Sequence, residues 1–532
     1  MNSEFPPLET ELADARAATR RGASVLDVRE AREWAEGVCP GAVCLALSEG
    51  IAPMLDWARN RSGPIYVFCA GGARSLRAAQ ALREAGVPAS AASLYVREVG
   101  HEQPLVAHRA TVPMNPASTM KIVTTLVGLD VLGPAYTWQT TFASNGRLQG
   151  GVLSGALYVK GSGDPKLTSE SLQAIVTALR ARGIREINGD LVIDRSRFAK
   201  AVHDPAAFDG LPLRPYNVGP DALLFNFKSV GFRFAPLPDG TVRVITDGAP
   251  PDGLSIVNTL RTTSGTCPQD WRSRMAPNFD DRGNAVTATF AGIYATDCGE
   301  RDWYVSLYDH TGLFAAMFAR LWRDAGGIWT GTTREGALPR NARVLHTHVS
   351  PPLATMVTDI NKFSNNVMAR QLLLTIDAEL SKRPAQAKRA GRSIRDWAKA
   401  RGFDLPDLVI ENGSGLSRIE RISAQSLAGM LEYGLTSPFA SDFLSSLPLA
   451  ATDGTLAKRF VNQLAEGNAY LKTGTLTGVK ALAGYLLLPD GRRMLFVGIV
   501  NHGNAEAAQK ALDSAVDWVY LTEAAKLKAL TR

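Results

Sequence analysis

The sequence is poor in cysteine and has no long apolar run. Its five cysteines among 532 residues are too few for a disulfide scaffold, and they are not grouped in the pairs that hold structural zinc. No stretch approaches the roughly 18 consecutive apolar residues that a membrane span needs. The sequence therefore excludes an integral membrane protein, and it predicts neither a metal site nor an organic cofactor.

The first 22 residues also lack the basic segment, apolar run and small-residue cleavage site of a secretory signal peptide. Taken literally, this predicts a cytoplasmic protein. The net charge of +7 lies beyond residue 90, because the first 90 residues hold ten Lys and Arg against eleven Asp and Glu. No dense basic run with interleaved aromatic residues occurs, so a nucleic-acid partner is not expected.

The apolar fraction of 45% and charged fraction of 20% are those of an ordinary globular protein. At about 150 residues per domain, the length predicts three or four domains. The first 88 residues alternate apolar runs with helix-like patterns. Strands are predicted at 24–28, 42–47 and 64–68, and helices at 30–36, 51–59 and 75–85. This alternation predicts a small parallel α/β domain.

The sequence changes character after residue 90. A strand is predicted at Ser93–Val99 and a largely apolar, buried helix at Ser118–Leu132. Residues 140–345 are rich in Gly, Pro and short β-like runs, which predicts inserted β-rich material. Helices return between 350 and 402. Strands near the C-terminus, followed by an amphipathic helix, predict an antiparallel sheet that the helix covers on one face.

Cys69 lies in a glycine-rich turn between a predicted strand and a predicted helix. The turn has the sequence Cys69-Ala-Gly-Gly-Ala-Arg74. Backbone N–H groups and the positive end of the helix dipole favour a thiolate there, and Arg74 adds a fixed positive charge. The alternative is an inert buried cysteine in a strand-to-helix turn. The flanking glycines and arginine favour a functional site.

With its surroundings, this loop resembles the rhodanese (sulfurtransferase) family. The matching segments are Asp27-Val-Arg29, Glu33-Trp34, Gly37, Pro40-Gly41-Ala42 and the Cys69–Arg74 loop. The loop is one residue shorter than the related phosphatase signature, so the resemblance implies sulfane sulfur rather than phosphate as its ligand. Val38-Cys39 and Ala70 depart from the family pattern. The last strand of the sheet is also missing, so we expect a truncated domain.

Three short motifs follow in order along the rest of the chain. They are Ser118-Thr-Met-Lys121, Ser364-Asn365-Asn366 and Lys472-Thr473-Gly474-Thr475, separated by 246 and 108 residues. Alone, each has an ordinary explanation: a helix surface pair, a helix N-cap and a glycine turn. In an apolar pocket, however, Lys121 would lose its proton readily and act as a base toward Ser118, one turn earlier. The ordered trio is typical of penicillin-binding proteins and β-lactamases.

Residues 80–525 resemble the D-alanyl-D-alanine carboxypeptidase/endopeptidase family, the class C low-molecular-mass penicillin-binding proteins. Further matching stretches are Met114–Lys121, Gly161–Pro165, Ile187–Asp190, Pro215–Val218, Asn412–Arg418, Asp453–Thr455 and Leu471–Leu476. The long first gap fits this family, which inserts extra domains between its first two motifs. Compact β-lactamases have a far shorter gap.

The resemblance implies a role for each motif residue. Ser118 would attack the carbonyl of the penultimate D-alanine, and Lys121 would take its proton. Ser364 would relay a proton to the leaving amine, while Lys472 supplies a positive field. The residues that would bind the substrate peptide and its terminal carboxylate are Asn366, Lys472, Thr473, Gly474 and Thr475. Backbone N–H groups of Ser118 and Thr475 would form the oxyanion hole.

The resemblance also implies partners and one covalent link. Peptidoglycan peptides would be the substrate, and β-lactam antibiotics would be covalent inhibitors that acylate the same serine. Cys267 and Cys298 lie where the family has paired cysteines, so a disulfide between them is expected. The alternative is two separate buried thiols.

Together these features predict a multidomain α/β and α+β protein. We expect a rhodanese-like domain over 1–88, a penicillin-binding, serine β-lactamase-like α+β domain of the transpeptidase type over 89–140 and 300–532, and inserted β-rich domains over 141–299. The expected function is a serine-type D-alanyl-D-alanine carboxypeptidase or D,D-endopeptidase. The alternative is a rhodanese-type sulfurtransferase or sulfur sensor whose C-terminal half binds peptides.

The two resemblances disagree about the compartment. The peptidase family implies the periplasm, whereas the absence of a signal peptide predicts the cytoplasm. The segment Gln80–Pro88 fits both the last rhodanese helix and the start of the peptidase. This predicts a fusion, natural or engineered, with its junction near 75–88. The alternative is natural export by a route that the sequence does not reveal.

Overall fold

The computed structural model describes residues 24–27, 42–44, 65–68 and 86–530. The chain divides into two compact units, Met1–Ala89 together with Ala507–Arg532, and Ser90–Glu506. The sequence assigns residues 507–532 to the peptidase domain, whereas in the structure they are grouped with the first unit; their domain assignment stays a prediction. Cys69 and Arg74, the predicted rhodanese-like site, lie outside the described residues.

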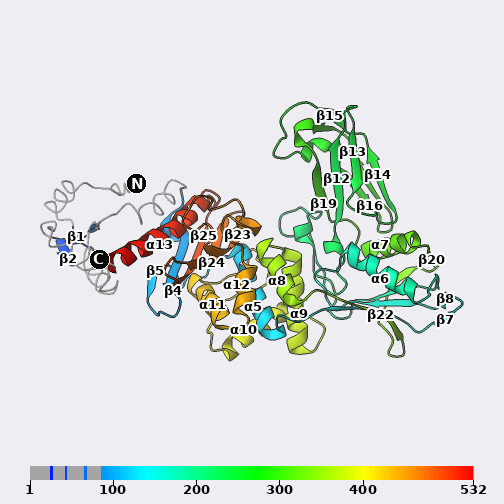
Figure 1. Cartoon of the computed structure of the whole chain (residues 1–532), viewed down its shortest axis with the longest axis horizontal. Coiled ribbons are helices and arrows are strands. Elements are labelled where there is room, and N and C mark those ends of the chain that lie inside the picture. The colour runs from blue at the N-terminus through cyan, green and yellow to red at the C-terminus, as the bar shows by residue number, and fades with distance from the viewer. Residues whose placement is uncertain (1–23, 28–41, 45–64, 69–85, 531–532) are drawn as a thin grey trace. The chain divides into compact units, whose positions relative to one another are not determined.

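The first unit contains a small parallel sheet (Figure 1). Its strands are β1 (Ser24–Asp27), β2 (Ala42–Cys44) and β3 (Ile65–Phe68), in the order β2-β1-β3. Both strand pairs are parallel, which confirms the parallel arrangement predicted for this region. The unit also holds the C-terminal helix α13 (Gln509–Leu530). No helix in the described part of the chain is both long and apolar enough to span a membrane.

The second unit is built on a five-stranded antiparallel sheet (Figure 1). In spatial order its strands are β23 (Ala469–Leu476), β24 (Val479–Leu487), β25 (Arg493–Asn501), β4 (Ala92–Glu98) and β5 (Pro104–His108). Nearly every residue of β24 and β25 is buried, as expected from their almost continuous apolar sequence. β23 is an edge strand, so one side of its backbone is not paired within the sheet.

Six helices accompany this sheet. They are α5 (Met120–Leu132), α8 (Leu353–Lys362), α9 (Asn366–Ser381), α10 (Ala387–Ala400), α11 (Ala424–Thr436) and α12 (Ala440–Ser446). α11 packs on β4, β24 and β25, and α5 contacts α8, α9 and α11. Ten of the thirteen residues of α5 are buried, because a helix that is apolar on all sides is stable only inside a core. The N-terminus of α5 is therefore held in the tightly packed core.

The chain leaves this core through β6 (Gln139–Ser144) and returns through β22 (Arg343–Val349), which pair antiparallel. We call residues 139–349 the inserted region. Its main sheet has the order β21-β11-β9-β6-β22, and a second sheet has the order β20-β10-β8-β7. The remaining elements of these two layers are β7 (Arg147–Gln149), β8 (Val152–Ser154), β9 (Leu157–Lys160), α6 (Ser169–Ala181), β10 (Glu186–Asn188), β11 (Leu191–Asp194), α7 (His310–Asp324), β20 (Ile328–Trp329) and β21 (Thr333–Glu335).

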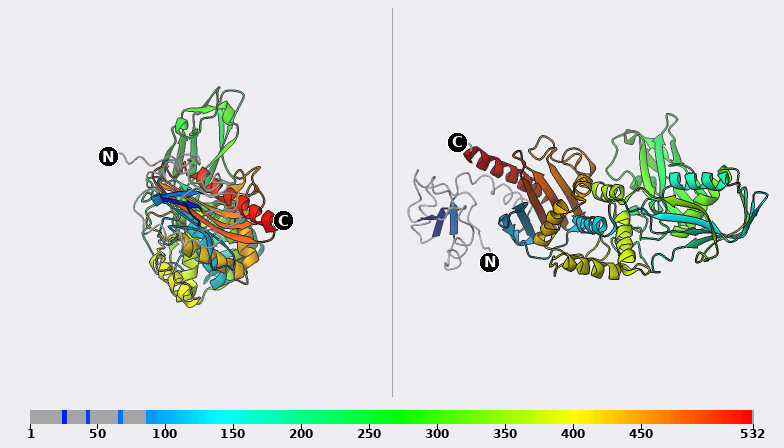
Figure 2. Two further views of the ribbon diagram at one scale, coloured as in Figure 1. Left: turned by 90° about the vertical axis from the view of Figure 1, so that its left-hand side faces the viewer. Right: turned by 60° about the horizontal axis from the view of Figure 1, so that its bottom comes forward.

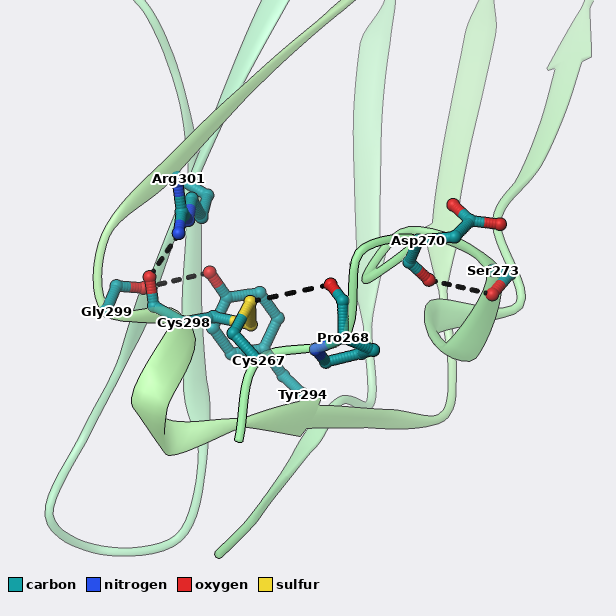
Figure 3. Close-up of a disulfide and its surroundings, with 8 residues drawn as sticks. All are labelled: Cys267, Pro268, Asp270, Ser273, Tyr294, Cys298, Gly299 and Arg301. Carbon is teal, nitrogen blue, oxygen red and sulfur yellow. Dashed lines mark hydrogen bonds between the residues drawn. A yellow bond between two sulfur atoms is a disulfide. The ribbon is translucent and has the colours of Figure 1, made fainter. Parts of the chain in front are cut away.

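A separate lobe of short strands projects from these layers (Figure 1, and Figure 2, left). We call residues 230–305 the disulfide lobe. Its strands are β12 (Val230–Pro236), β13 (Val242–Thr246), β14 (Leu254–Asn258), β15 (Arg261–Thr263), β16 (Asn278–Asp281), β17 (Val286–Phe290), β18 (Ile293–Ala295) and β19 (Arg301–Val305). Cys267 and Cys298 are joined in a disulfide, as the family resemblance implies. The ring of Tyr294 lies beside this bond, and its hydroxyl donates a hydrogen bond of 2.8 Å to the carbonyl of Gly299 (Figure 3).

The inserted region is longer than the sequence predicted. The expected boundary at residue 299 is wrong, because β19, β21 and β22 pair with β12, β11 and β6 of the same region. Residues 300–349 therefore belong to the insert and not to the peptidase core. The backbone groups of these strands have partners far back in the chain, and the sequence of a strand does not show which strand it pairs with. The Gly- and Pro-rich character that continues to residue 345 was the better guide.

Candidate active site

Ser118 lies in the short helix η3 (Ala117–Thr119), directly before α5. Asn115 organises this turn, since its Oδ1 accepts from the Ala117 N–H at 2.9 Å and its Nδ2 donates to the Ser417 carbonyl at 2.8 Å. Asn501, at the end of β25, pairs with both backbone groups of Asn115 at 2.8 and 3.0 Å. Ala117 has a φ of +45°, a conformation that costs a non-glycine residue about 1–3 kcal/mol. The surrounding contacts hold the serine in this strained turn.

Lys121 is fully buried, one turn after Ser118. Its Nζ lies 3.0 Å from Ser118 Oγ and 2.6 Å from Asn366 Oδ1, and it also donates to the Ser414 carbonyl. Burial lowers the pKa of Lys121 well below its usual value, and the positive charges of Lys472 and Arg370 lower it further. A neutral amine so close to a serine hydroxyl can accept its proton.

A second serine–lysine pair lies next to the first. Lys472 is fully buried on β23, and its Nζ donates to Ser364 Oγ and to the Thr473 carbonyl, both at 2.9 Å. Burial lowers the pKa of Lys472 to about 7. Near neutral pH this lysine is therefore divided between its charged and neutral forms.

The Ser-x-Asn motif connects the two lysines. Ser364 contacts Lys472 and Asn366 contacts Lys121, with one residue between them. That intervening residue, Asn365, is the N-cap of α9, and its side chain accepts from the Met368 N–H at 3.1 Å. The helix cap is thus Asn365 and not Ser364, whose φ of +56° turns the chain just before the helix. One strained turn therefore directs two polar side chains to two different lysines.

The edge strand β23 carries the third motif past the nucleophile. Gly474 lies so close to the turn before Ser118 that a Cβ there would be 2.7 Å from the Pro116 carbonyl oxygen. Thr473 Oγ1 donates to Thr455 Oγ1 at 2.9 Å, and Lys480 Nζ donates to the exposed Thr475 Oγ1 at 3.2 Å. The glycine thus permits close contact between strand and helix, while the two threonines flank the meeting point.

The loop Asn412–Arg418, for which the sequence indicated only a resemblance to the family, also shapes the site. Ser414 supplies the carbonyl that contacts Lys121, and the Gly413 carbonyl accepts from Thr124 Oγ1 at 2.7 Å. At Gly415 a Cβ would come within 1.9 Å of the Ala117 carbonyl oxygen, so only glycine fits behind the nucleophile. The sequence Asn-Gly-Ser-Gly indicates a tight turn, but it does not indicate which lysine this turn contacts.

A cavity of about 1100 Å³ adjoins this loop from the side of the inserted region. It is lined in part by Phe208, Asn217, Arg370 and Arg418, and it does not include Ser118, Lys121, Ser364 or Lys472. The guanidinium of Arg418 lies 4.5 Å from the centroid of the Phe208 ring. Among the described residues, no group of three or more His, Cys, Asp and Glu side chains is placed to hold a metal ion.

Two serine–lysine pairs that meet at an edge strand are characteristic of the penicillin-binding class of serine hydrolases. Comparison with known proteins narrows this class. The model of the D-Ala-D-Ala carboxypeptidase 3 (S13) family matches residues 77–521, and the chain belongs to this family. A rhodanese-like domain model matches residues 9–95. The two matches overlap at 77–95, which includes the segment that resembles both families.

Relatives match over most of their lengths. A D-alanyl-D-alanine carboxypeptidase of Actinomadura sp. (strain R39) is 29% identical over 75% of this chain and 76% of its own. The D-alanyl-D-alanine carboxypeptidase DacB of Haemophilus influenzae is 24% identical over 76% of this chain and 84% of its own. The crystal structure of penicillin-binding protein 4 from H. influenzae has a TM-score of 0.69 at 23% identity, covering 82% and 98% of the two chains. The fold predicted for residues beyond the rhodanese-like domain is thereby confirmed.

Proposed function

We propose that this protein hydrolyses the terminal D-alanyl-D-alanine bond of peptidoglycan peptides through an acyl-serine intermediate on Ser118. The observation that carries the proposal is the Ser-x-Asn motif, whose serine and asparagine each contact one of two buried lysines. Such an arrangement gives the nucleophile its own base and gives the leaving group a separate proton donor. The family match and the named carboxypeptidase relatives favour this function over the alternative of sulfur transfer.

In the proposed acylation step, Ser118 Oγ attacks the carbonyl carbon of the penultimate D-alanine. Its proton passes to the neutral Lys121 amine, 3.0 Å away. Backbone N–H groups of Ser118 and Thr475 would stabilise the oxyanion. The C–N bond then breaks as the leaving amine receives a proton through Ser364, which lies 2.9 Å from Lys472 Nζ. The products of this half-reaction are free D-alanine and an ester on Ser118.

Deacylation restores the enzyme. Lys121 first gives up the proton that it took from Ser118, and this restores the proton that Lys472 supplied through Ser364. A water molecule then attacks the ester carbonyl and gives a proton to the neutral Lys121 amine, and the ester bond to Ser118 Oγ breaks. The carboxylic acid of the shortened peptide leaves, and Ser118 regains its proton. The same steps applied to a D-alanine that is linked to a second stem peptide would give D,D-endopeptidase activity.

The substrate peptide would lie along the edge strand β23. The start of this strand is paired on its outer side with residues 448–450, since the Leu471 N–H donates to the Pro448 carbonyl at 2.9 Å. Beyond Leu471 the outer backbone side can pair with an extended peptide, and Thr473, Thr475 and the charged form of Lys472 can receive the terminal carboxylate. Both threonine hydroxyls are held by neighbouring side chains, which supports a preformed site. A β-lactam would acylate the same serine.

The proposed location of this activity is outside the cytoplasmic membrane, in the periplasm. Peptidoglycan is found there, and the disulfide between Cys267 and Cys298 is of a kind that persists in oxidising compartments. Fractionation of a native host, with an antibody against the chain, tests this location. Recovery in the cytoplasmic fraction alone would contradict it.

The decisive experiment is the intact mass of the protein after incubation with benzylpenicillin. We expect one adduct on the wild type and none on Ser118→Ala. Release of D-alanine from a pentapeptide ending in D-Ala-D-Ala, measured on the same two proteins, tests the hydrolytic half-reaction. A folded wild type that forms no adduct would refute the proposed nucleophile.

A further inference from the structure

Glu420 is a fully buried carboxylate beneath the site that no step of the proposed reaction uses. Its Oε1 accepts from three consecutive backbone N–H groups, those of Glu411, Asn412 and Gly413, at 3.1, 2.9 and 2.8 Å. Its Oε2 is buried and has no hydrogen-bond partner among the described residues. A carboxylate so placed needs an explanation, because burial without a full set of partners is costly.

The three N–H donors belong to the loop that forms the wall behind Lys121. The same loop supplies the Ser414 carbonyl to Lys121 Nζ and the Gly413 carbonyl to Thr124, one turn further along α5. Within the described part of the chain, no side chain donates a hydrogen bond to the Glu420 carboxylate. Its carboxylate therefore fixes the start of the loop, and the loop in turn fixes the lysine.

The negative charge of Glu420 also acts on Lys121. The charged groups that act on Lys121 are Lys472 on β23, Arg370 on α9 and Glu420. The two cations oppose a positive charge on Lys121, and Glu420 favours it. Burial and the neighbouring Glu411 raise the pKa of Glu420 itself, while the three N–H donors act in the opposite direction. Arg370, buried in α9, also faces Glu420.

Proton transfer from Ser118 gives Lys121 a positive charge that the charges of Lys472 and Arg370 oppose. In a site from which water is excluded, such a charge is stabilised by fixed opposite charge. We propose that Glu420 is a positioning residue that holds the loop against Lys121 and supplies the negative charge that stabilises its protonated form during acylation. This inference rests on the proposed acyl-serine reaction and adds to it a residue that acts through Lys121.

The test compares the pH dependence of acylation in matched variants. The second-order rate constant for benzylpenicillin is measured from pH 5 to 9 in the wild type, Glu420→Gln, Glu420→Asp and Asp404→Asn. Glutamine keeps the shape and the accepting oxygen but removes the charge. Asp404→Asn is the control, because it removes an exposed carboxylate between α10 and this loop.

We expect Glu420→Gln to acylate about tenfold more slowly on the plateau, the effect of about one pKa unit in the base. Its acid limb should move to lower pH, because Lys121 without the nearby anion loses its proton more easily. Glu420→Asp should keep the acid limb of the wild type, and Asp404→Asn should match the wild type in rate and profile. A purely structural role for Glu420 would lower the rate without moving the limb.

A wild-type rate and pH profile in Glu420→Gln would overturn the inference. So would the same displaced limb in Glu420→Asp, which keeps the charge; this variant also decides the matter if Glu420→Gln does not fold. Absence of any adduct on the wild type would instead refute the proposed reaction itself. The two failures are therefore distinguishable in one set of measurements.

Discussion

The active-site core and the disulfide lobe differ in the kinds of side chain that they bury. Around Ser118 the core buries several ionisable side chains, among them Lys121, Arg370, Glu420 and Lys472. In the disulfide lobe, residues 230–305, no charged side chain is buried. Its interior consists of apolar and aromatic residues with one disulfide, and its ion pairs, such as Arg233 with Asp302, are exposed. The lobe contributes stability, whereas the core maintains an unfavourable charge arrangement that the reaction needs.

The aromatic packing of the lobe illustrates the contrast. Phe234 lies within 5.0–6.3 Å, centroid to centroid, of the rings of Trp271, Phe290 and Tyr294. Such pairs add to the area that each ring buries. The buried lysines of the core have depressed pKa values, which means that the fold holds them against their preference for water.

The largest effect is expected from Lys121→Met. Loss of the base should lower the rate of benzylpenicillin acylation by about 10³-fold. The melting temperature should change little, because methionine is apolar and of similar length and removes a buried amine. Lys399→Met, at an exposed position on α10, is the control and should change neither quantity. A large loss of stability in Lys121→Met would mean that this lysine supports the fold.

Phe234→Ala in the lobe should lower stability and leave the acylation rate unchanged, the opposite of Lys121→Met. Removing this fully buried ring should lower the free energy of unfolding by about 3–5 kcal/mol. The acylation rate of the folded protein should stay the same, since the ring has no contact with the site. Ile245→Ala, at a side chain 45% exposed, should change stability by no more than about 0.5 kcal/mol. Chemical denaturation and acylation kinetics on the same samples check both.

Removal of the disulfide should also lower the free energy of unfolding, by less than Phe234→Ala does. Cys267→Ser combined with Cys298→Ala opens a loop of 31 residues and should cost about 2–4 kcal/mol of stability. Thermal unfolding with and without a reductant should give the same difference for the wild type and none for the double variant. Slower acylation in the folded double variant would show that the lobe affects the site, and would contradict the view that the lobe contributes only stability.

The smallest expected effect is a pH dependence of stability that comes from Lys472. Its pKa of about 7 in the folded state lies below the value of about 10.4 in an unfolded chain. Between these values the unfolded state binds more protons, so stability rises with pH. Lys472 should contribute about 1 kcal/mol from pH 7 to pH 8. In Lys472→Met this part of the rise should be absent; equal slopes in both proteins would contradict the low pKa.

Local patterns in the sequence predicted most of the core. The helix expected at Ser118–Leu132 is η3 followed by α5, and the strand expected at Ser93–Val99 is β4. These segments are long, strongly apolar and bounded by Pro or Gly, which makes their type readable from local sequence. The insert boundary was missed because β19, β21 and β22 pair with strands that lie far back in the chain.

The sequence by itself determined the reactive groups and their order: a serine with a lysine one turn later, a Ser-x-Asn turn and a Lys-Thr-Gly strand. Only the tertiary structure decided that Asn366 contacts Lys121 while Ser364 contacts Lys472. The same holds for Glu420, whose position beneath the loop behind Lys121 no local pattern shows. The physical reason is that a lysine becomes a base only when burial removes its water and places other charges near it. Both conditions depend on segments that are separated by hundreds of residues in the chain and meet only in the folded core.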